Sequence, residues 1–142
     1  GAITRLLDMG VENYLISSAL LGVLAQRLVR VICRTCIEPI EVAPALLAEI
    51  DNPGQGSIKT FHGKGCKECN HTGFRGRAGI YELLVVDDSV RKLILTKATS
   101  QTIRESARKK GMTTLREDGW QKVAKGVTTV EEVLRVTLNE QT

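Results

Sequence analysis

Four cysteines are the residues of this sequence whose type and spacing best fit a chemical role. They stand as two C-x-x-C pairs, Cys33 with Cys36 and Cys66 with Cys69, and residues 37–65 separate the pairs. A C-x-x-C turn points two sulfur atoms at one spot, and two such turns together supply the tetrahedron of thiolates that a structural zinc ion prefers. The spacer is longer than the ~15–20 residues usual for such sites, so we expect it to contain structure of its own.

A zinc ion held by four thiolates has no open coordination position, so the site is expected to stabilise structure and not to catalyse a reaction. The thiolates outweigh the charge of the ion, and basic side chains close in sequence can offset the excess: Arg34, Lys64, Lys67, Arg75 and Arg77. His62 and His71 also lie near the cysteines. With four thiolates available, we expect both to be ordinary loop histidines.

Four cysteines could also form disulfides, a redox pair or the ligands of an iron–sulfur cluster. Disulfides require an oxidising compartment, and the sequence shows no signal peptide. A redox pair is disfavoured because two pairs occur and neither has thioredoxin-like surroundings. An iron–sulfur cluster uses the same four ligands, and the sequence leaves that alternative open.

The composition is that of a globular chain with an aliphatic core. The 142 residues suffice for one ordinary domain or two small ones; 42% are hydrophobic, 25% charged and only 4% aromatic. The net charge of +4 permits a contact with nucleic acid or an anionic membrane without requiring one. The longest apolar run, residues 14–25, is shorter than the ~20 residues that a membrane span needs.

Residues 1–32 are predicted to be helical. A short helix ends near Gly10, and a longer one begins at Ser17 or Ser18 and continues to residue 32. Its apolar residues lie on nearly every side, which is typical of a helix buried in a large domain. We therefore expect residues 1–32 to be the edge of a larger domain that the chain does not contain.

Residues 33–77 are predicted to form the metal-binding subdomain. Its spacer is expected to hold a short helix over 42–50, a loop over 52–56 and a strand over 57–62. A glycine-rich turn over 72–79 precedes a strand over 80–86.

The third region, 78–142, is predicted to continue from that strand into four short amphipathic helices. They begin at Asp87 or Asp88, at Ser100, and at two capping boxes over 114–117 and 128–131. The predicted fold is mainly α, with a small α+β zinc-binding subdomain and a C-terminal helical bundle.

The chain contains no convincing active site. No GxxxxGK[ST] phosphate-binding loop occurs, and the series Gly73, Gly76, Gly79 is spaced unlike a dinucleotide fingerprint and precedes a strand.

Four separate motifs stand out along the chain: GVLAQRLVRVICRTC at 22–36, GCKECNHTGFRGRAGIYELL at 65–84, GMTTLREDG at 111–119 and GVTTVEEVLR at 126–135. Together they resemble the C-terminal part of one known family, the type II secretion and type IV pilus assembly ATPases. The resemblance covers essentially the whole chain.

The resemblance implies a hexameric, cytoplasmic motor on the inner membrane that drives a membrane platform protein to assemble pilin-like subunits. Binding of ATP and Mg²⁺ would belong to the upstream motifs of the family, so this chain alone is not expected to hydrolyse ATP. Arg77 is expected near the nucleotide in the intact motor, although balancing the thiolate charge explains it equally well.

Two alternatives remain for the chain itself. A zinc-ribbon nucleic-acid-binding module fits the metal turns and the basic charge, but basic residues are spread along the chain and few aromatic residues can stack on bases. A thiol–disulfide protein is the other, and it differs from zinc binding in the reactivity of its thiols. Whether the motor serves secretion or pili is left open.

Overall fold

The computed structural model describes residues 1–42, 45 and 59–138. They form two compact units, each made of two chain segments. Unit 1 comprises Gly1–Ala25 and Glu82–Thr114, and unit 2 comprises the described parts of Gln26–Tyr81 and Leu115–Gln141. The predicted division at residues 32 and 77 stays a prediction.

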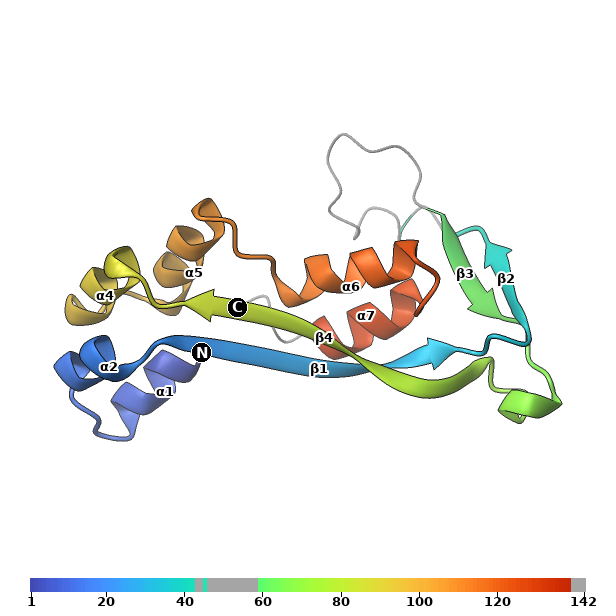
Figure 1. The fold of residues 1–142 in the computed structure, drawn as a ribbon, viewed down its shortest axis with the longest axis horizontal. Coiled ribbons are helices and arrows are strands. Elements are labelled where there is room, and N and C mark those ends of the chain that lie inside the picture. The colour runs from blue at the N-terminus through green and yellow to red at the C-terminus, as the bar shows by residue number, and fades with distance from the viewer. Residues whose placement is uncertain (43–44, 46–58, 139–142) are drawn as a thin grey trace. The chain divides into compact units, whose positions relative to one another are not determined.

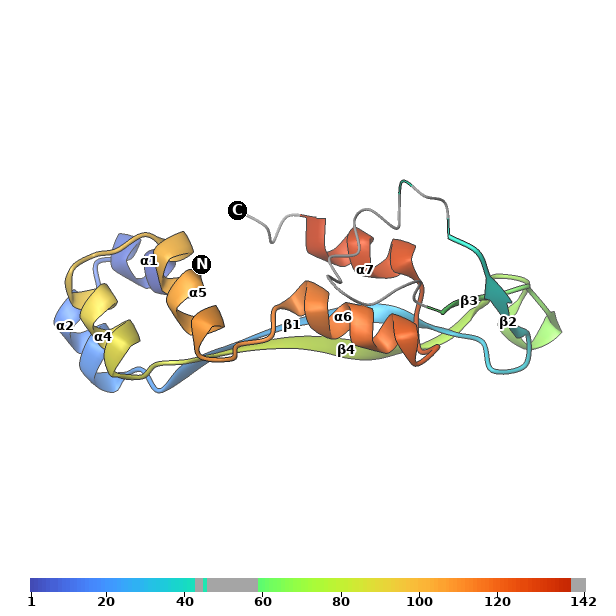
Figure 2. The same ribbon diagram turned by 90° about the horizontal axis from the view of Figure 1, so that it is seen from above.

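Unit 1 contains the helices α1 (Ala2–Asp8), α2 (Asn13–Ala19), α4 (Asp88–Leu95) and α5 (Ser100–Lys109), which gather in both views of Figures 1 and 2. Its core is built from aliphatic side chains: Ile3, Ile16, Val86, Val90, Ile94 and Ile103. Asp87 caps α4 as predicted, because its carboxylate accepts a hydrogen bond of 2.9 Å from the Val90 amide.

The long helix predicted to continue to residue 32 is wrong. Helix α2 ends at Ala19, and residues Gly22–Ile32 form strand β1, which pairs with β4 (Phe74–Val85) in a two-stranded sheet. Val29 is buried while Leu28 and Arg30 on either side of it are exposed, as expected for a strand with two different faces. A continuous apolar run has no period, so it does not distinguish a strand from a buried helix.

Unit 2 contains a second sheet, in which β2 (Ile37–Ile40) pairs antiparallel with β3 (Thr60–Gly63). Ile37 lies opposite Gly63, and Ile40 lies opposite Thr60. Strand β3 confirms the strand predicted over 57–62, before the second cysteine pair, although β3 ends one residue later than predicted. The helix predicted over 42–50 and the loop predicted over 52–56 lie outside the described residues, apart from residues 42 and 45.

Strand β4 begins at Phe74, so most of the predicted glycine turn over 72–79 belongs to the strand and not to a loop. The positive φ of Gly76, 85°, places a local irregularity inside the strand that an alternating pattern does not reveal. The strand predicted over 80–86 is confirmed as the second half of β4.

The last two helices, α6 (Leu115–Ala124) and α7 (Val130–Thr137), pack against each other in unit 2 and lie side by side in Figures 1 and 2. Gly119 permits their close approach, because a Cβ atom there would lie 2.6 Å from Cγ1 of Val133. The predicted single C-terminal bundle is not confirmed, since α4 and α5 belong to unit 1 whereas α6 and α7 belong to unit 2.

The described residues thus form both helices and strands, with six α-helices and two two-stranded sheets, rather than the mainly α fold predicted. Within the described ranges, every helix is too short or too polar to cross a bilayer.

Candidate metal centre

The structure brings the four predicted cysteine side chains together. All four Sγ atoms lie within 4.8 Å of one another. The Sγ atoms of Cys33 and Cys66 are 3.8 Å apart, those of Cys36 and Cys69 are 3.8 Å apart, and those of Cys66 and Cys69 are 3.7 Å apart. A tetrahedron with Zn–S bonds of about 2.3 Å has sulfur–sulfur edges of about 3.8 Å. The donor set therefore fits a tetrahedral thiolate-bound ion such as Zn²⁺.

A short 3₁₀ turn, η1 (Lys67–Cys69), forms the second cysteine turn. The chain reverses after it because Asn70 and His71 both have positive φ angles, 53° and 61°. The His71 amide donates to the Cys66 carbonyl at 2.8 Å. This tight reversal presents the sulfur atoms of Cys66 and Cys69 on the same side.

Backbone amides point at the sulfur atoms. The Gly65 amide donates to Sγ of Cys36, and the amides of Cys66 and Gly73 donate to Sγ of Cys69, all at 3.3 Å. Hydrogen bonds from amides favour the charged form of an acceptor. The turns thus supply the dipoles that a cluster of thiolates requires.

The two cysteine turns are joined through their backbones. The Cys33 amide donates to the Gly73 carbonyl at 2.9 Å, and the Lys64 amide donates to the Cys36 carbonyl at 3.1 Å. Gly63 and Gly73 lie so close that a Cβ atom on Gly73 would be 2.5 Å from the carbonyl oxygen of Gly63. Glycine at both positions is what allows the turns to meet.

The four thiols differ in environment. Cys33 and Cys69 are buried, with exposed fractions of 1% and 5%, whereas Cys36 and Cys66 are partly exposed. Burial opposes ionisation of Cys69, but the amides of Cys66 and Gly73 outweigh it and lower its pKa to about 6. Burial raises the pKa of Cys36 to about 11. A metal ion would favour the thiolate form of all four.

The other candidates from the sequence lie apart from the sulfur cluster. Nε2 of His62 is 2.8 Å from Oε1 of Glu38 across the β2–β3 pair, and neither His62 nor His71 belongs to the cluster. Arg75 forms an ion pair of 3.3 Å with Glu68 on the second turn. Arg77 is an exposed residue of β4, and its expected place near a nucleotide stays a prediction.

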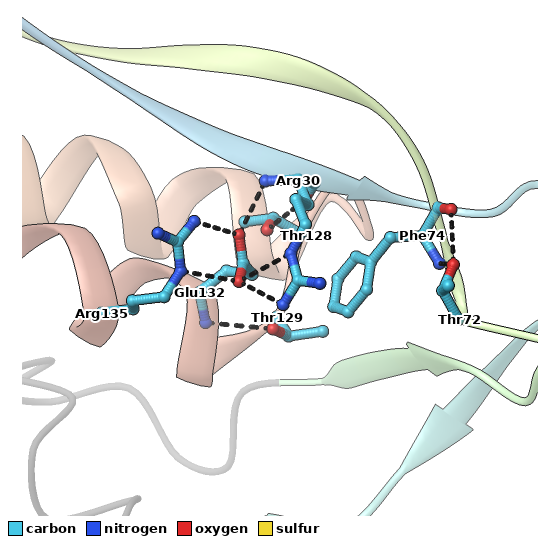
Figure 3. Close-up of polar contacts among 7 residues, drawn as sticks. All are labelled: Arg30, Thr72, Phe74, Thr128, Thr129, Glu132 and Arg135. Atoms are coloured by element: carbon cyan, nitrogen blue, oxygen red, sulfur yellow. Dashed lines mark hydrogen bonds and ion pairs between the residues drawn. The ribbon is translucent and has the colours of Figure 1, made fainter.

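Glu132 is a residue that the sequence did not single out. It is buried on α7, and its carboxylate accepts hydrogen bonds from the backbone and the guanidinium of Arg30, both as short as 2.8 Å, and from Arg135 at 2.9 Å (Figure 3). Although burial opposes ionisation, these bonds lower the pKa of Glu132 to about 2. Arg30 also stacks on the Phe74 ring, 4.1 Å from its centroid.

Glu132, Arg30, Arg135 and Phe74 together are called the Glu132 cluster. Because Phe74 directly follows Gly73, its ring connects this cluster to the second cysteine turn (Figure 3). The sequence signal for this contact was weak: the capping box was predicted one residue early, at 128–131. In the structure Thr129 caps α7, accepting from the Glu132 amide at 3.1 Å. The Glu132 side chain itself binds Arg30 and Arg135.

Comparison with known proteins identifies the family of the chain. A sequence model described as "Type II/IV secretion system protein" matches residues 1–135. The chain belongs to this family. It is 51% identical over 140 residues to the type II secretion system protein E of Pseudomonas aeruginosa, and 48% identical over 140 residues to the type IV pilus assembly ATPase PilB of Thermus thermophilus. The family resemblance inferred from the motifs is confirmed.

The chain is also 47% identical over 137 residues to the type II secretion system ATPase E of Vibrio cholerae. The matches cover 96–99% of this chain but only 28%, 27% and 16% of the Pseudomonas, Vibrio and Thermus proteins. This member of the secretion family therefore spans between 16% and 28% of the length of these relatives.

Proposed function

We propose that the chain is the zinc-containing C-terminal part of a hexameric motor ATPase that powers type II secretion or type IV pilus assembly. Zn²⁺ bound by Cys33, Cys36, Cys66 and Cys69 keeps two distant turns together, and the helices carry movements of the motor to its partners. ATP and Mg²⁺ bind in the full-length protein, away from the four cysteines.

The observation that carries the proposal is the sulfur tetrahedron in a chain that the secretion family model matches almost throughout. The full-length motor would work in the cytoplasm at the inner membrane, and its partners would be an inner-membrane platform protein and other secretion or pilus components. Nucleic acid is not among them.

The metal is tested by elemental analysis of reduced protein. We expect about one zinc per chain, and thiols that react with a chromogenic reagent only after a chelator removes the ion. Iron in place of zinc would assign a cluster. Thiols that react at once in the absence of chelator would support the thiol–disulfide alternative instead.

The motor function is tested with a chimeric protein that contains this chain. The matching region of the Pseudomonas aeruginosa type II secretion system protein E is replaced by this chain, and type II secretion is measured in a strain lacking the native protein. We expect secretion with the intact chain and loss of it with Cys66→Ser. A chimera that is produced at normal level but does not secrete would count against the proposal, and ATP hydrolysis by the isolated chain would contradict it.

The nucleic-acid alternative is tested by binding of DNA or RNA at several salt concentrations. Arg30 and Arg135 are occupied by Glu132, and Arg75 is paired with Glu68, which leaves fewer basic groups for phosphates than the composition suggests. We expect weak binding without the steep salt dependence that many phosphate contacts produce.

A further inference from the structure

A pocket of about 430 Å³ lies in unit 2, beside strand β3 and the first turn of helix α7. Consecutive β3 residues line it, together with the end of β2, Arg30 of β1 and Phe74 of β4. It is separate from the sulfur cluster, since none of the four cysteines lines it.

Part of the pocket lining is apolar. Its uncharged lining includes two aromatic rings and the aliphatic side chains of Ile40, Val42 and Val130. Val130 is fully buried, and both rings, those of Phe61 and Phe74, are partly accessible. Such a surface suits a hydrocarbon chain or the methylene groups of a long side chain.

The charges around the pocket are mainly negative. Three carboxylates line it, those of Glu41, Glu131 and Glu132, against the one guanidinium of Arg30. Glu132 and Arg30 bind each other. Glu41 and Glu131 are exposed and form no ion pair with the described residues. The surplus is negative, so the complementary ligand is a cation.

Arg30 already shows how a basic side chain can bind in this pocket, by contacting an aromatic ring and a carboxylate together. The guanidinium carbon of Arg30 lies over the Phe74 ring, 4.1 Å from its centroid, while two guanidinium nitrogen atoms donate hydrogen bonds to the Glu132 carboxylate (Figure 3). A second basic side chain could use the partly accessible Phe61 ring in the same way, with its charge near Glu41 and Glu131.

We propose that this pocket is a docking site for a partner protein, and that it binds a segment carrying lysine or arginine between aliphatic residues. The methylene groups of the basic side chain pack on the apolar wall, and its charge pairs with Glu41 and Glu131. The proposal does not depend on the motor function, because it rests on the lining of unit 2 alone.

The probe is a pair of short peptides with blocked ends and the sequences ALKLKA and ALELEA. Each is titrated into the zinc-loaded, ¹⁵N-labelled chain, and amide shifts are followed by NMR. We expect the basic peptide to shift the amides of Thr60–Gly63 and of residues 129–132, with millimolar affinity. The acidic peptide should leave them unchanged.

Charge-reversal substitutions test whether the carboxylates of Glu41 and Glu131 bind the basic peptide. Glu41→Lys and Glu131→Lys should each weaken binding of the basic peptide about two- to fivefold, in line with an exposed ion pair. Glu41 lies outside any helix or strand, so its replacement leaves the start of α7 intact. Asp8→Lys, at an exposed carboxylate of unit 1, is the matched control and should have no effect.

Four results would overturn the proposal. The two peptides could bind equally, or the shifts could fall outside the pocket. Amide shifts that depend on protein concentration without peptide would assign the pocket to a second copy of the chain. Finally, a basic peptide that fails to bind, with residues 43–58 responding to Glu131→Lys, would assign the pocket to the chain itself.

Discussion

Gly73 lies where the two cysteine turns meet, and the contact leaves no room for a side chain at this position. Its φ of 83° disfavours any side chain, and a Cβ atom would collide with the carbonyl oxygen of Gly63, which cannot move without its strand. We expect Gly73→Ala to lower the free energy of unfolding by about 2–4 kcal/mol and to weaken zinc binding. Denaturant unfolding and a competing zinc indicator measure the two effects.

Gly76 supplies the matched control. It has nearly the same φ, 85°, but a Cβ atom there would meet nothing within 4 Å. Gly76→Ala should cost only the backbone strain, about 1 kcal/mol, and should leave zinc affinity unchanged. Equal effects of the two substitutions would show that the contact with Gly63 does not matter.

Glu132 makes stability depend on pH. Its carboxyl has a pKa of about 2 in the folded chain against an ordinary value of 4.5, so its contribution is fully present above about pH 4.5 and disappears as the pH falls towards 2. The shift corresponds to about 3 kcal/mol. We expect Glu132→Gln to be less stable by about this amount at pH 7, and the difference from the parent chain to shrink below pH 4.5.

Denaturant unfolding of both proteins across this range measures the difference, and loss of zinc at low pH affects both alike. Glu131→Gln, one residue earlier and exposed, is the control, with an expected effect below about 0.5 kcal/mol. A constant difference between Glu132→Gln and the parent chain at all pH values would exclude the charge as the cause.

At the scale of elements, helix α4 depends on its cap. Asp87 binds the Val90 amide at 2.9 Å and pairs with Lys110 at 2.9 Å, and both contacts lower the pKa of its carboxyl. We expect Asp87→Ala to destabilise unit 1 by about 1–2 kcal/mol, mainly through the lost cap. Faster hydrogen exchange at the start of α4 would locate the effect.

Asp88 is the comparison for this helix. Its side chain is 97% exposed, and within the described part of the chain its one ion pair is with Arg91 at 3.0 Å. Asp88→Ala should therefore cost no more than about 0.5 kcal/mol. If both alanine variants behaved alike, the cap would not be the feature that fixes the start of α4.

The start of α4 was predictable to within one residue, because Asp87 or Asp88 was expected to cap it and Asp87 does. The start predicted at Ser17 or Ser18 was wrong, because both residues lie near the end of α2. The start of α7 was ambiguous at residues 128–129, where two threonines compete, and the second one caps α7. Strand β1 was missed for a different reason. Leu20 to Ala25 suits either a buried helix or a strand, and only the pairing of β1 with β4, distant in sequence, decides between them.

At the scale of the whole chain, the two units have separate cores. The core of unit 1 includes Ile3, Val90 and Ile103, and that of unit 2 includes Trp120 and Val133. Because all four cysteines belong to unit 2, we expect a chelator to speed hydrogen exchange in β2, β3 and α7 while α2 and α4 keep their protection.

Hydrogen exchange with mass spectrometry, with and without chelator, follows both units in one sample. Readdition of zinc should restore the slow exchange of unit 2. Equal loosening of both units on metal removal would show that they fold as one cooperative body.

The metal site could be predicted from the sequence because each C-x-x-C pair carries its own geometry, and bringing two pairs together leaves one arrangement for a tetrahedral ion. The Glu132 cluster could not. Its members come from β1, β4 and α7, and Arg30, Phe74 and Glu132 are ordinary residues until the fold places them in contact.

The four cysteines are unequally buried, so a bound ion would be more accessible through two of its ligands. Cys33 and Cys69 are buried, while Cys36 and Cys66 are partly exposed. Exchange of the ion with an external acceptor would therefore start at the two accessible ligands, and the rate of release would be set by these two.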